Sequence, residues 1–173
     1  IYQTDKLTIV IHIRVPGKTV KLLISANPQS PTIHITSVSY ENPETPPAFC
    51  MLLRKHLEDG RIAKIEQHSL DRIVRMDLDV RDESGAITTK SLIFELMGKH
   101  SNLVFTHNGI ILDALKRVGL AANRHRQILP GRQYVLPPGQ ERLNILTVPA
   151  ERFMAALLSK QDLTLTKAIF STA

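Results

Sequence analysis

The stretch from Glu66 to Asn102 decides the fold of this chain, and it reads EQHSLDRIVRMDLDVRDESGAITTKSLIFELMGKHSN. From Val74 to Val80 every second residue is apolar, and the residues between them are charged. This alternation predicts a β-strand with one buried face and one solvated face. The polar run at residues 82–85 predicts a turn. Residues 87–97, which are apolar on both faces near their end, predict a central strand that is buried twice.

Upstream of this stretch, the chain has the pattern of an antiparallel meander. Apolar residues alternate along residues 7–15, residues 19–26 predict a return strand, and residues 33–36 predict a short third strand. Pro16-Gly17-Lys18 separates the first two strands and predicts a hairpin turn. A further short strand is predicted at residues 61–67.

One helix is predicted between these strands, starting after Thr45 and running to about residue 58, because its apolar positions recur at helical spacing. Thr45 is the predicted N-cap, with prolines in the first helical turn, and Gly60 is the predicted C′ residue. Cys50 adds apolar bulk to this helix, so we interpret it as a core residue rather than a nucleophile.

The C-terminal half holds a hairpin and then a second domain. Asn108-Gly109 lies between two apolar runs, which is the strongest hairpin signal in the sequence. After Pro149, apolar residues at helical spacing predict two short helices that begin a second, helical domain. The expected fold class is therefore α+β, with an antiparallel, sandwich-like first domain and short C-terminal helices.

The composition indicates a globular protein with a basic surface. Hydrophobic residues make up 43% of the 173 residues, which excludes a disordered chain. The formal charge of +6 favours a polyanionic partner, although a charge of this size also serves solubility. The single cysteine permits no internal disulfide and indicates a reducing compartment. No apolar run reaches the length of a membrane span and no signal peptide is recognisable, so a cytoplasmic location is expected.

Most of the positive charge lies in residues 111–142, where six basic residues face two acidic ones, a net charge of +4. The basic residues are Lys116, Arg117, Arg124, Arg126, Arg132 and Arg142. Several glycines and prolines make this segment irregular. An extended, arginine-rich segment suits phosphate binding, because guanidinium groups match phosphate oxygens in pairs. The alternative is a loop whose charges are simply solvated.

A charged pair, Asp71-Arg72, stands between Leu70 and Ile73 immediately before the alternating strand. Charges so close to a buried strand have either a partner or a function. Spacing alone leaves two interpretations open: a local ion pair or a turn that leads into the strand, and a functional site.

The sequence lacks the common motifs of catalysis and cofactor binding. It has no glycine-rich phosphate loop, no Cys/His cluster at metal-ligand spacing and no nucleophile-elbow serine. No enzymatic activity, cofactor or metal is therefore expected, and the residues alone indicate a basic α+β domain.

Three motifs resemble the N-terminal domain of the NFACT family, in its bacterial RqcH branch, long described as fibronectin-binding protein A-like and related to eukaryotic NEMF. They are PPAFCMLLRKH at 46–56, LDRI at 70–73 and ELMGKHSN at 95–102. Residues 123–134 also fit this branch. The resemblance implies a first domain at 1–142, without the family's first helix, and the start of a helix-hairpin-helix domain at 143–173. It also implies a fold similar to the N-terminal domain of formamidopyrimidine-DNA glycosylases, although nothing at Ile1-Tyr2 matches the proline nucleophile of those enzymes.

The resemblance further implies a role in ribosome-associated quality control. Relatives bind the large ribosomal subunit carrying a stalled peptidyl-tRNA, recruit alanyl-tRNA and direct C-terminal alanine tailing of the nascent chain. In this branch the Asp-Arg pair is the functional motif, which maps onto Asp71 and Arg72. The expected RNA-binding residues are Asp71, Arg72, Lys99, His100, Arg117, Arg124, Arg126 and Arg132.

Two other functions compete with this one. The older family description suggests an extracellular adhesin that binds fibronectin. The fold resemblance suggests a DNA-processing enzyme, but a fold alone is a weak argument for function, and no residue is placed to form a Schiff base.

Overall fold

The structure is a computed structural model that describes residues 1–124, 126–138 and 143–172. The chain divides into two compact units, Ile1–Val135 and Leu136–Ala173. The domain boundary predicted after residue 142 falls at residues 139–142, which lie outside the described residues.

The first unit begins with a four-stranded antiparallel sheet in the order β1-β2-β3-β4. Its strands are β1 (Tyr2–Asp5), β2 (Thr8–Val15), β3 (Lys18–Ser25) and β4 (Thr32–Thr36). Each strand pairs with its neighbour in sequence, so the predicted meander is confirmed. The β2–β3 turn has Gly17 at φ 77°, a conformation that glycine adopts without steric cost.

A five-stranded antiparallel sheet follows, also in chain order. Its strands are β5 (Arg61–Gln67), β6 (Ile73–Arg81), β7 (Ile87–Glu95), β8 (Asn102–His107) and β9 (Ile110–Ala114). The β8–β9 hairpin turns at Asn108 and Gly109, with φ values of 50° and 77°. A two-residue turn of this kind requires positive φ at both positions, so the predicted hairpin is confirmed.

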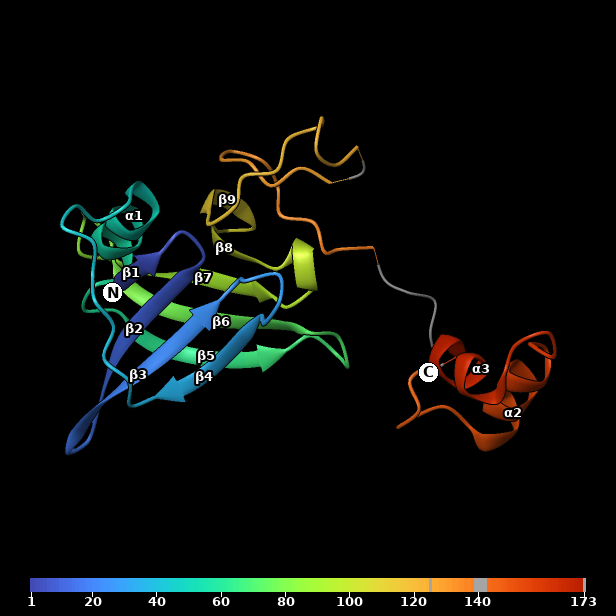
Figure 1. The fold of residues 1–173 in the computed structure, drawn as a ribbon. Coiled ribbons are helices and arrows are strands. Elements are labelled where there is room, and N and C mark those ends of the chain that lie inside the picture. Colours follow the sequence, from blue (N-terminus) through green and yellow to red (C-terminus); the bar gives the residue numbers. More distant parts are fainter. Residues whose placement is uncertain (125, 139–142, 173) are drawn as a thin grey trace. The chain divides into compact units, whose positions relative to one another are not determined.

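The main core lies between the two sheets, which Figure 1 shows as two layers. The four-stranded sheet contributes Ile9, Ile11, Leu22 and Ile24, and the five-stranded sheet contributes Met76, Leu78, Val80, Leu92, Phe94, Leu103 and Phe105. Helix α1 (Ala48–Leu57) adds Phe49, Leu53 and Leu57. Cys50 is 1% exposed, as expected of a core residue. The predicted α+β class, with two antiparallel sheets, is confirmed.

A second, smaller core lies on the opposite face of the five-stranded sheet and consists of Ile73, Ile93, Val104, Ile111, Ala114 and Ile128. In β7, Ile93 points to this face while its neighbours Leu92 and Phe94 point to the main core. Residues 115–135, here called the arginine segment, cover this face and contribute Ile128. This covering explains why β7 is buried on both faces, as its sequence predicted.

The arginine segment is irregular but ordered by backbone hydrogen bonds. Val118 and Ile128 pair as an isolated bridge, with N···O distances of 2.8 and 2.9 Å. Farther along, Ile111 N donates to Arg132 O at 2.8 Å and Tyr134 N donates to Gly109 O at 2.7 Å. The segment therefore returns along the free edge of β9.

The ends of α1 differ from the prediction. Its N-cap is Pro47, which makes no side-chain cap bond, so the predicted N-cap at Thr45 is wrong. At the other end the left-handed residue is Asp59, with φ 62°, and not Gly60. Gly60 is required because a Cβ atom there would lie 2.8 Å from Val80 Cγ1 and 2.9 Å from Leu57 O. The glycine permits close packing of the helix end against β6.

The second unit contains the two predicted short helices, α2 (Ala150–Leu158) and α3 (Leu165–Thr172). Pro149 is the N-cap of α2, and Leu143 N donates to Thr172 O at 2.7 Å. The assignment of these helices to a helix-hairpin-helix domain stays a prediction. Within the described residues, no helix is long and apolar enough to cross a membrane.

Candidate nucleic-acid interface

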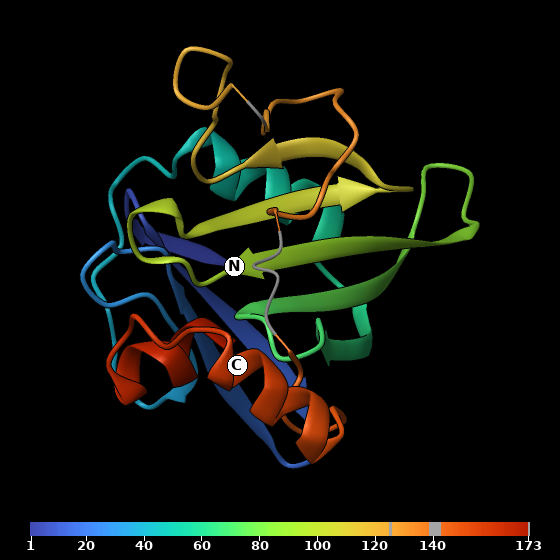
Figure 2. The same ribbon diagram turned by 90° about the vertical axis from the view of Figure 1, so that its right-hand side faces the viewer.

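Two connections carrying predicted site residues meet at one end of the five-stranded sheet. Because its strands are antiparallel and in chain order, the β5–β6 and β7–β8 connections and the last residue of β9 share this end. Leu96 N donates to Arg72 O at 2.8 Å, which joins the first two directly. Figure 2 shows both ends of the sheet. The end with the short helix that follows β7 is here called the loop end. The opposite end, where the 82–86 turn projects, is called the turn end.

Asp71 and Arg72 lie in the β5–β6 connection, whose backbone is held by local hydrogen bonds. Asp71 N donates to His68 O at 3.0 Å, and His68 N donates to Ile73 O at 2.9 Å. Gln67 Nε2 donates to Asp71 O at 2.9 Å. The backbone therefore presents the two charged side chains from a defined turn.

Both side chains of this pair are exposed, whereas the adjoining Ile73 is 2% exposed and anchors the loop to the sheet. Among the residues that the structure describes, neither Asp71 nor Arg72 makes an ion pair. The local ion pair that the sequence left open is therefore not formed, whereas the other structural alternative, a turn that leads into the strand, is present. Both charged side chains are exposed to solvent at adjacent positions in the chain.

Lys99 and His100 lie beside this loop in the short 3₁₀ helix η1 (Gly98–His100), and both are exposed. Gly98 has φ 55°, which lets the chain turn sharply at the end of β7. Two neighbouring motif residues hold η1 in place. Ser101 Oγ accepts a hydrogen bond from Met97 N at 2.8 Å, and the buried Asn102 bonds both the N–H and the C=O of Lys116 at 2.9 and 2.7 Å.

Lys116 links η1 to the start of the arginine segment. Its Nζ atom donates to Lys99 O at 3.3 Å and to Ala26 O at 3.5 Å. Burial lowers the pKa of Lys116 below its ordinary value. This lysine therefore contributes to local packing as well as to charge.

Arg117 is paired rather than free. Its Nε and Nη2 atoms donate to the two carboxylate oxygens of Asp113, both at 2.8 Å. Burial alone would raise the pKa of Asp113, but the hydrogen bonds from Arg117 and from Ala114 N outweigh it and lower the pKa. The Arg117 side chain as a whole remains 59% exposed.

Arg126 is buried, with a side chain that is 9% exposed, and it binds the carboxylate of Glu95, which is 1% exposed. Its Nη1 and Nη2 atoms donate to Glu95 Oε2 and Oε1 at 2.9 and 2.5 Å, and its Nε atom donates to Val135 O at 2.5 Å. Tyr134 OH donates to Glu95 Oε1 at 2.8 Å. Burial alone would lower the pKa of Arg126, but the hydrogen bonds and charge of Glu95 outweigh it and raise the pKa. Burial also raises the pKa of Tyr134. Arg126 therefore has a structural role, which its sequence position did not indicate.

Arg124 and Arg132 are exposed on the same segment. A surface hollow of about 290 Å³ lies between them, lined by Arg124, Arg126, Gln127, Arg132, Gln133 and Val135. The structure thus separates the four predicted arginines into one buried residue, one paired surface residue and two exposed residues that flank a hollow.

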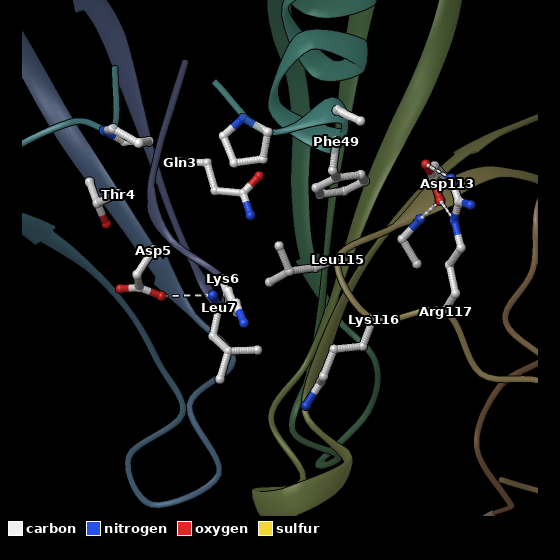
Figure 3. A pocket seen from close by; sticks show the side chains of 14 residues that line it. Gln3, Thr4, Asp5, Lys6, Leu7, Phe49, Asp113, Leu115, Lys116 and Arg117 are labelled. Atoms are coloured by element: carbon white, nitrogen blue, oxygen red, sulfur yellow. Dashed lines mark hydrogen bonds and ion pairs between the residues drawn. The ribbon is translucent and has the colours of Figure 1, made fainter. Parts of the chain in front are cut away.

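A larger groove of about 750 Å³ was not indicated by the sequence, because its walls come from distant segments. Figure 3 shows it between β1, the start of α1 and the end of β9, with Phe49 and Leu115 in its apolar wall and Lys116 and Arg117 along one side. Gln3 is 6% exposed, and its Oε1 atom accepts no hydrogen bond from the residues that the structure describes. Within the described residues, no group of His, Cys, Asp or Glu is placed to hold a metal.

The whole chain, residues 1–173, matches the sequence family described as NFACT N-terminal and middle domains. A curated relative from Bacillus subtilis, described as Rqc2 homolog RqcH, is 47% identical over 148 residues. The match takes 84% of this chain but 26% of the relative, so the chain spans about a quarter of that protein's length.

Two solved structures share this fold. The N-terminal domain of fibronectin-binding protein PavA from Streptococcus pneumoniae has a TM-score of 0.83 and 33% identity. The N-terminal part of the fibronectin/fibrinogen-binding protein FBPS from Streptococcus suis has a TM-score of 0.84 and 33% identity. In both cases the match covers 97% of this chain and 68% of the other.

Proposed function

The chain belongs to the NFACT family, and from that premise we propose that it is the RNA-recognition module of a ribosome-associated quality control factor. In this role it binds alanyl-tRNA and the large ribosomal subunit carrying a stalled peptidyl-tRNA, in the cytoplasm. The factor then directs alanine tailing of the stalled chain. The similarity to a curated protein described as an Rqc2 homolog supports this proposal.

One observation carries it: Asp71 and Arg72 are both exposed, pair with no charged residue of the described ranges, and lie on a loop whose backbone is held by hydrogen bonds. A guanidinium in this position pairs with phosphate or stacks on an unpaired base. A carboxylate repels phosphate, but it accepts hydrogen bonds from base amino groups and ribose hydroxyls. The pair is therefore suited to an RNA loop with exposed base edges.

The neighbouring cations extend this surface. Lys99 and His100 lie in η1 beside the Asp71-Arg72 loop, and Arg124 and Arg132 are exposed on the arginine segment. We assign to them contacts with RNA phosphates, so affinity should fall steeply with salt. The module acts by binding and positioning, with no catalytic group or cofactor of its own. We also propose that the fold of the first unit is similar to that of the N-terminal domain of formamidopyrimidine-DNA glycosylases, and we infer no function from this similarity.

The test is to replace Asp71 and Arg72 separately with alanine in the protein expressed in its native cells. Each variant should lose transfer-RNA co-purification and alanine tailing while it keeps ribosome association. Because both side chains are exposed, the free energy of unfolding of each variant should lie within about 0.5 kcal/mol of the wild-type value. Arg14→Ala, at an exposed arginine of β2, is the matched control and should keep all three activities. Stable variants that still bring down transfer RNA and still tail would contradict the proposal.

A second candidate is fibronectin binding, which the descriptions of the two solved structures favour. Two parallel binding measurements, one with immobilised fibronectin and one with transfer RNA, distinguish fibronectin binding from RNA recognition. Binding to fibronectin that is unaffected by Asp71→Ala and Arg72→Ala, together with no binding to RNA, would favour the adhesin.

A further inference from the structure

Glu95 occupies the position where the loop-end segments meet. It is the last residue of β7, and in the sheet register it lies opposite Ile73 on one side and Asn102 on the other. Ile73 directly follows Arg72, and Asn102 directly follows the η1 turn and Ser101. The backbone of Glu95 is thus adjacent to both connections that carry the exposed site residues.

The side chain of Glu95 reaches a third segment. It points to the outer face of the sheet, where it binds Arg126 through both carboxylate oxygens and accepts a hydrogen bond from the Tyr134 hydroxyl. Arg126 Cζ also lies 5.1 Å from the centre of the Tyr134 ring. Arg124 and Arg132 lie on either side of Arg126 in the sequence and line the same hollow. One buried carboxylate therefore holds the middle of the arginine segment against the sheet.

We propose that Glu95 is a positioning residue that joins the Asp71-Arg72 loop, η1 and the arginine segment into one composite surface for structured RNA. Arg124 and Arg132 contact phosphates on this surface, while the Asp71-Arg72 loop contacts an adjoining unpaired base. Arg126 takes no part in RNA contact, because its charge is neutralised by Glu95. This inference rests on the proposed function and adds the residue that organises its site.

Because Glu95 is negatively charged, the direction in which Glu95→Gln changes RNA affinity tests the inference. If charge alone governed RNA binding, Glu95→Gln would strengthen it, because the substitution removes a negative charge and leaves Arg126 without a counter-ion. If Glu95 acts by positioning, the same substitution weakens binding, because the neutral amide accepts only through one oxygen and the segment loosens.

The experiment measures the affinity of the chain for a purified transfer RNA, together with amide hydrogen exchange. Glu95→Gln should weaken binding by at least about tenfold. It should also speed exchange at Val118, Ile128 and Tyr134, whose amides hold the arginine segment in place. Exchange in the centres of β6 and β7 should stay slow. Tyr134→Phe removes one hydrogen bond only and should give a smaller loss in the same direction.

Asp79→Asn is the matched control, because Asp79 is a carboxylate on the neighbouring strand whose partner is the Thr89 hydroxyl at 2.8 Å. It should leave RNA affinity and amide exchange in the arginine segment unchanged.

Equal or tighter RNA binding by Glu95→Gln, or unchanged amide exchange in the arginine segment, would overturn the inference. If Glu95→Gln does not fold, Tyr134→Phe decides by the same two measurements. Loss of RNA binding in Asp71→Ala with normal binding in Glu95→Gln would reject the inference alone, whereas a wild type that binds no transfer RNA would reject the proposed function as well.

Discussion

The two ends of the five-stranded sheet are built in different ways. At the turn end, the 82–86 turn closes on itself: Gly85 N donates to Asp82 O, Asp82 N donates to Ala86 O, and Asp82 Oδ1 accepts from Ser84 and Ala86. The Asn108-Gly109 hairpin is equally local. At the loop end, Asn102 bonds Lys116, which is 14 residues away, and Glu95 bonds Arg126 and Tyr134, which are 31 and 39 residues away.

The loop end therefore combines long-range contacts that stabilise the fold with exposed side chains, whereas the turn end is stabilised by local contacts. The turn end needs only a few adjacent residues of the right conformational preference, because its hydrogen bonds join residues that are close in sequence. The loop end leaves Asp71, Arg72, Lys99 and His100 exposed, and their arrangement depends on contacts between distant segments. Substitutions at the two ends should therefore have different consequences for the free energy of unfolding and for binding.

The largest effect on stability is expected from Arg126→Ala at the loop end. It leaves the Glu95 carboxylate buried without its cation, which should cost about 3–5 kcal/mol in the free energy of unfolding. Urea titration followed by circular dichroism measures this loss. Arg124→Ala is the control, since an exposed arginine two residues away should change stability by no more than about 0.5 kcal/mol. Similar losses in both variants would show that the Glu95–Arg126 pair is not special.

A smaller loss is expected from Gly109→Val at the turn end. Gly109 has φ 77°, and a β-branched residue in that conformation is strained, at a cost of about 1–3 kcal/mol. Gly119→Val is the control, because Gly119 has no positive φ and a Cβ atom there meets nothing within 4 Å. Thermal melts compare the two. A Gly109→Val protein as stable as the Gly119→Val protein would disprove the strain argument for the hairpin.

The smallest effect concerns the partly exposed Asp113–Arg117 pair, and it depends on pH. The folded-state pKa of Asp113 is lowered from its ordinary value of 3.8, so its contribution to stability is present above that value. The contribution is lost as the pH falls through the lower folded-state pKa. The difference in melting temperature between the wild type and Asp113→Asn should therefore be constant near neutral pH and shrink below about pH 4. A difference that stays constant into strong acid would show that Asp113 does not act as a carboxylate.

The candidate site was partly predictable. The alternation after Ile73 and the family resemblance together predicted Asp71 and Arg72 as site residues, and the structure exposes both side chains. The role of Arg126 was missed because the sequence shows it only as one of several basic residues in an irregular segment. A signal did exist at its partner: Glu95 is a carboxylate at the end of a strand predicted to be buried on both faces, where a charge needs a counter-ion.

The sequence by itself determined most strands of this protein, with β1 the exception, the body of helix α1 and the tight turns, because each depends on residues that are neighbours in the chain. Period-two alternation specifies β2 and β6, and Asn108-Gly109 specifies the hairpin through its own backbone preferences. The tertiary structure alone decided which arginines are buried, which are exposed and which segments lie beside the Asp71-Arg72 loop. Such pairings join residues tens of positions apart, and they follow from burial in the folded chain rather than from any local pattern.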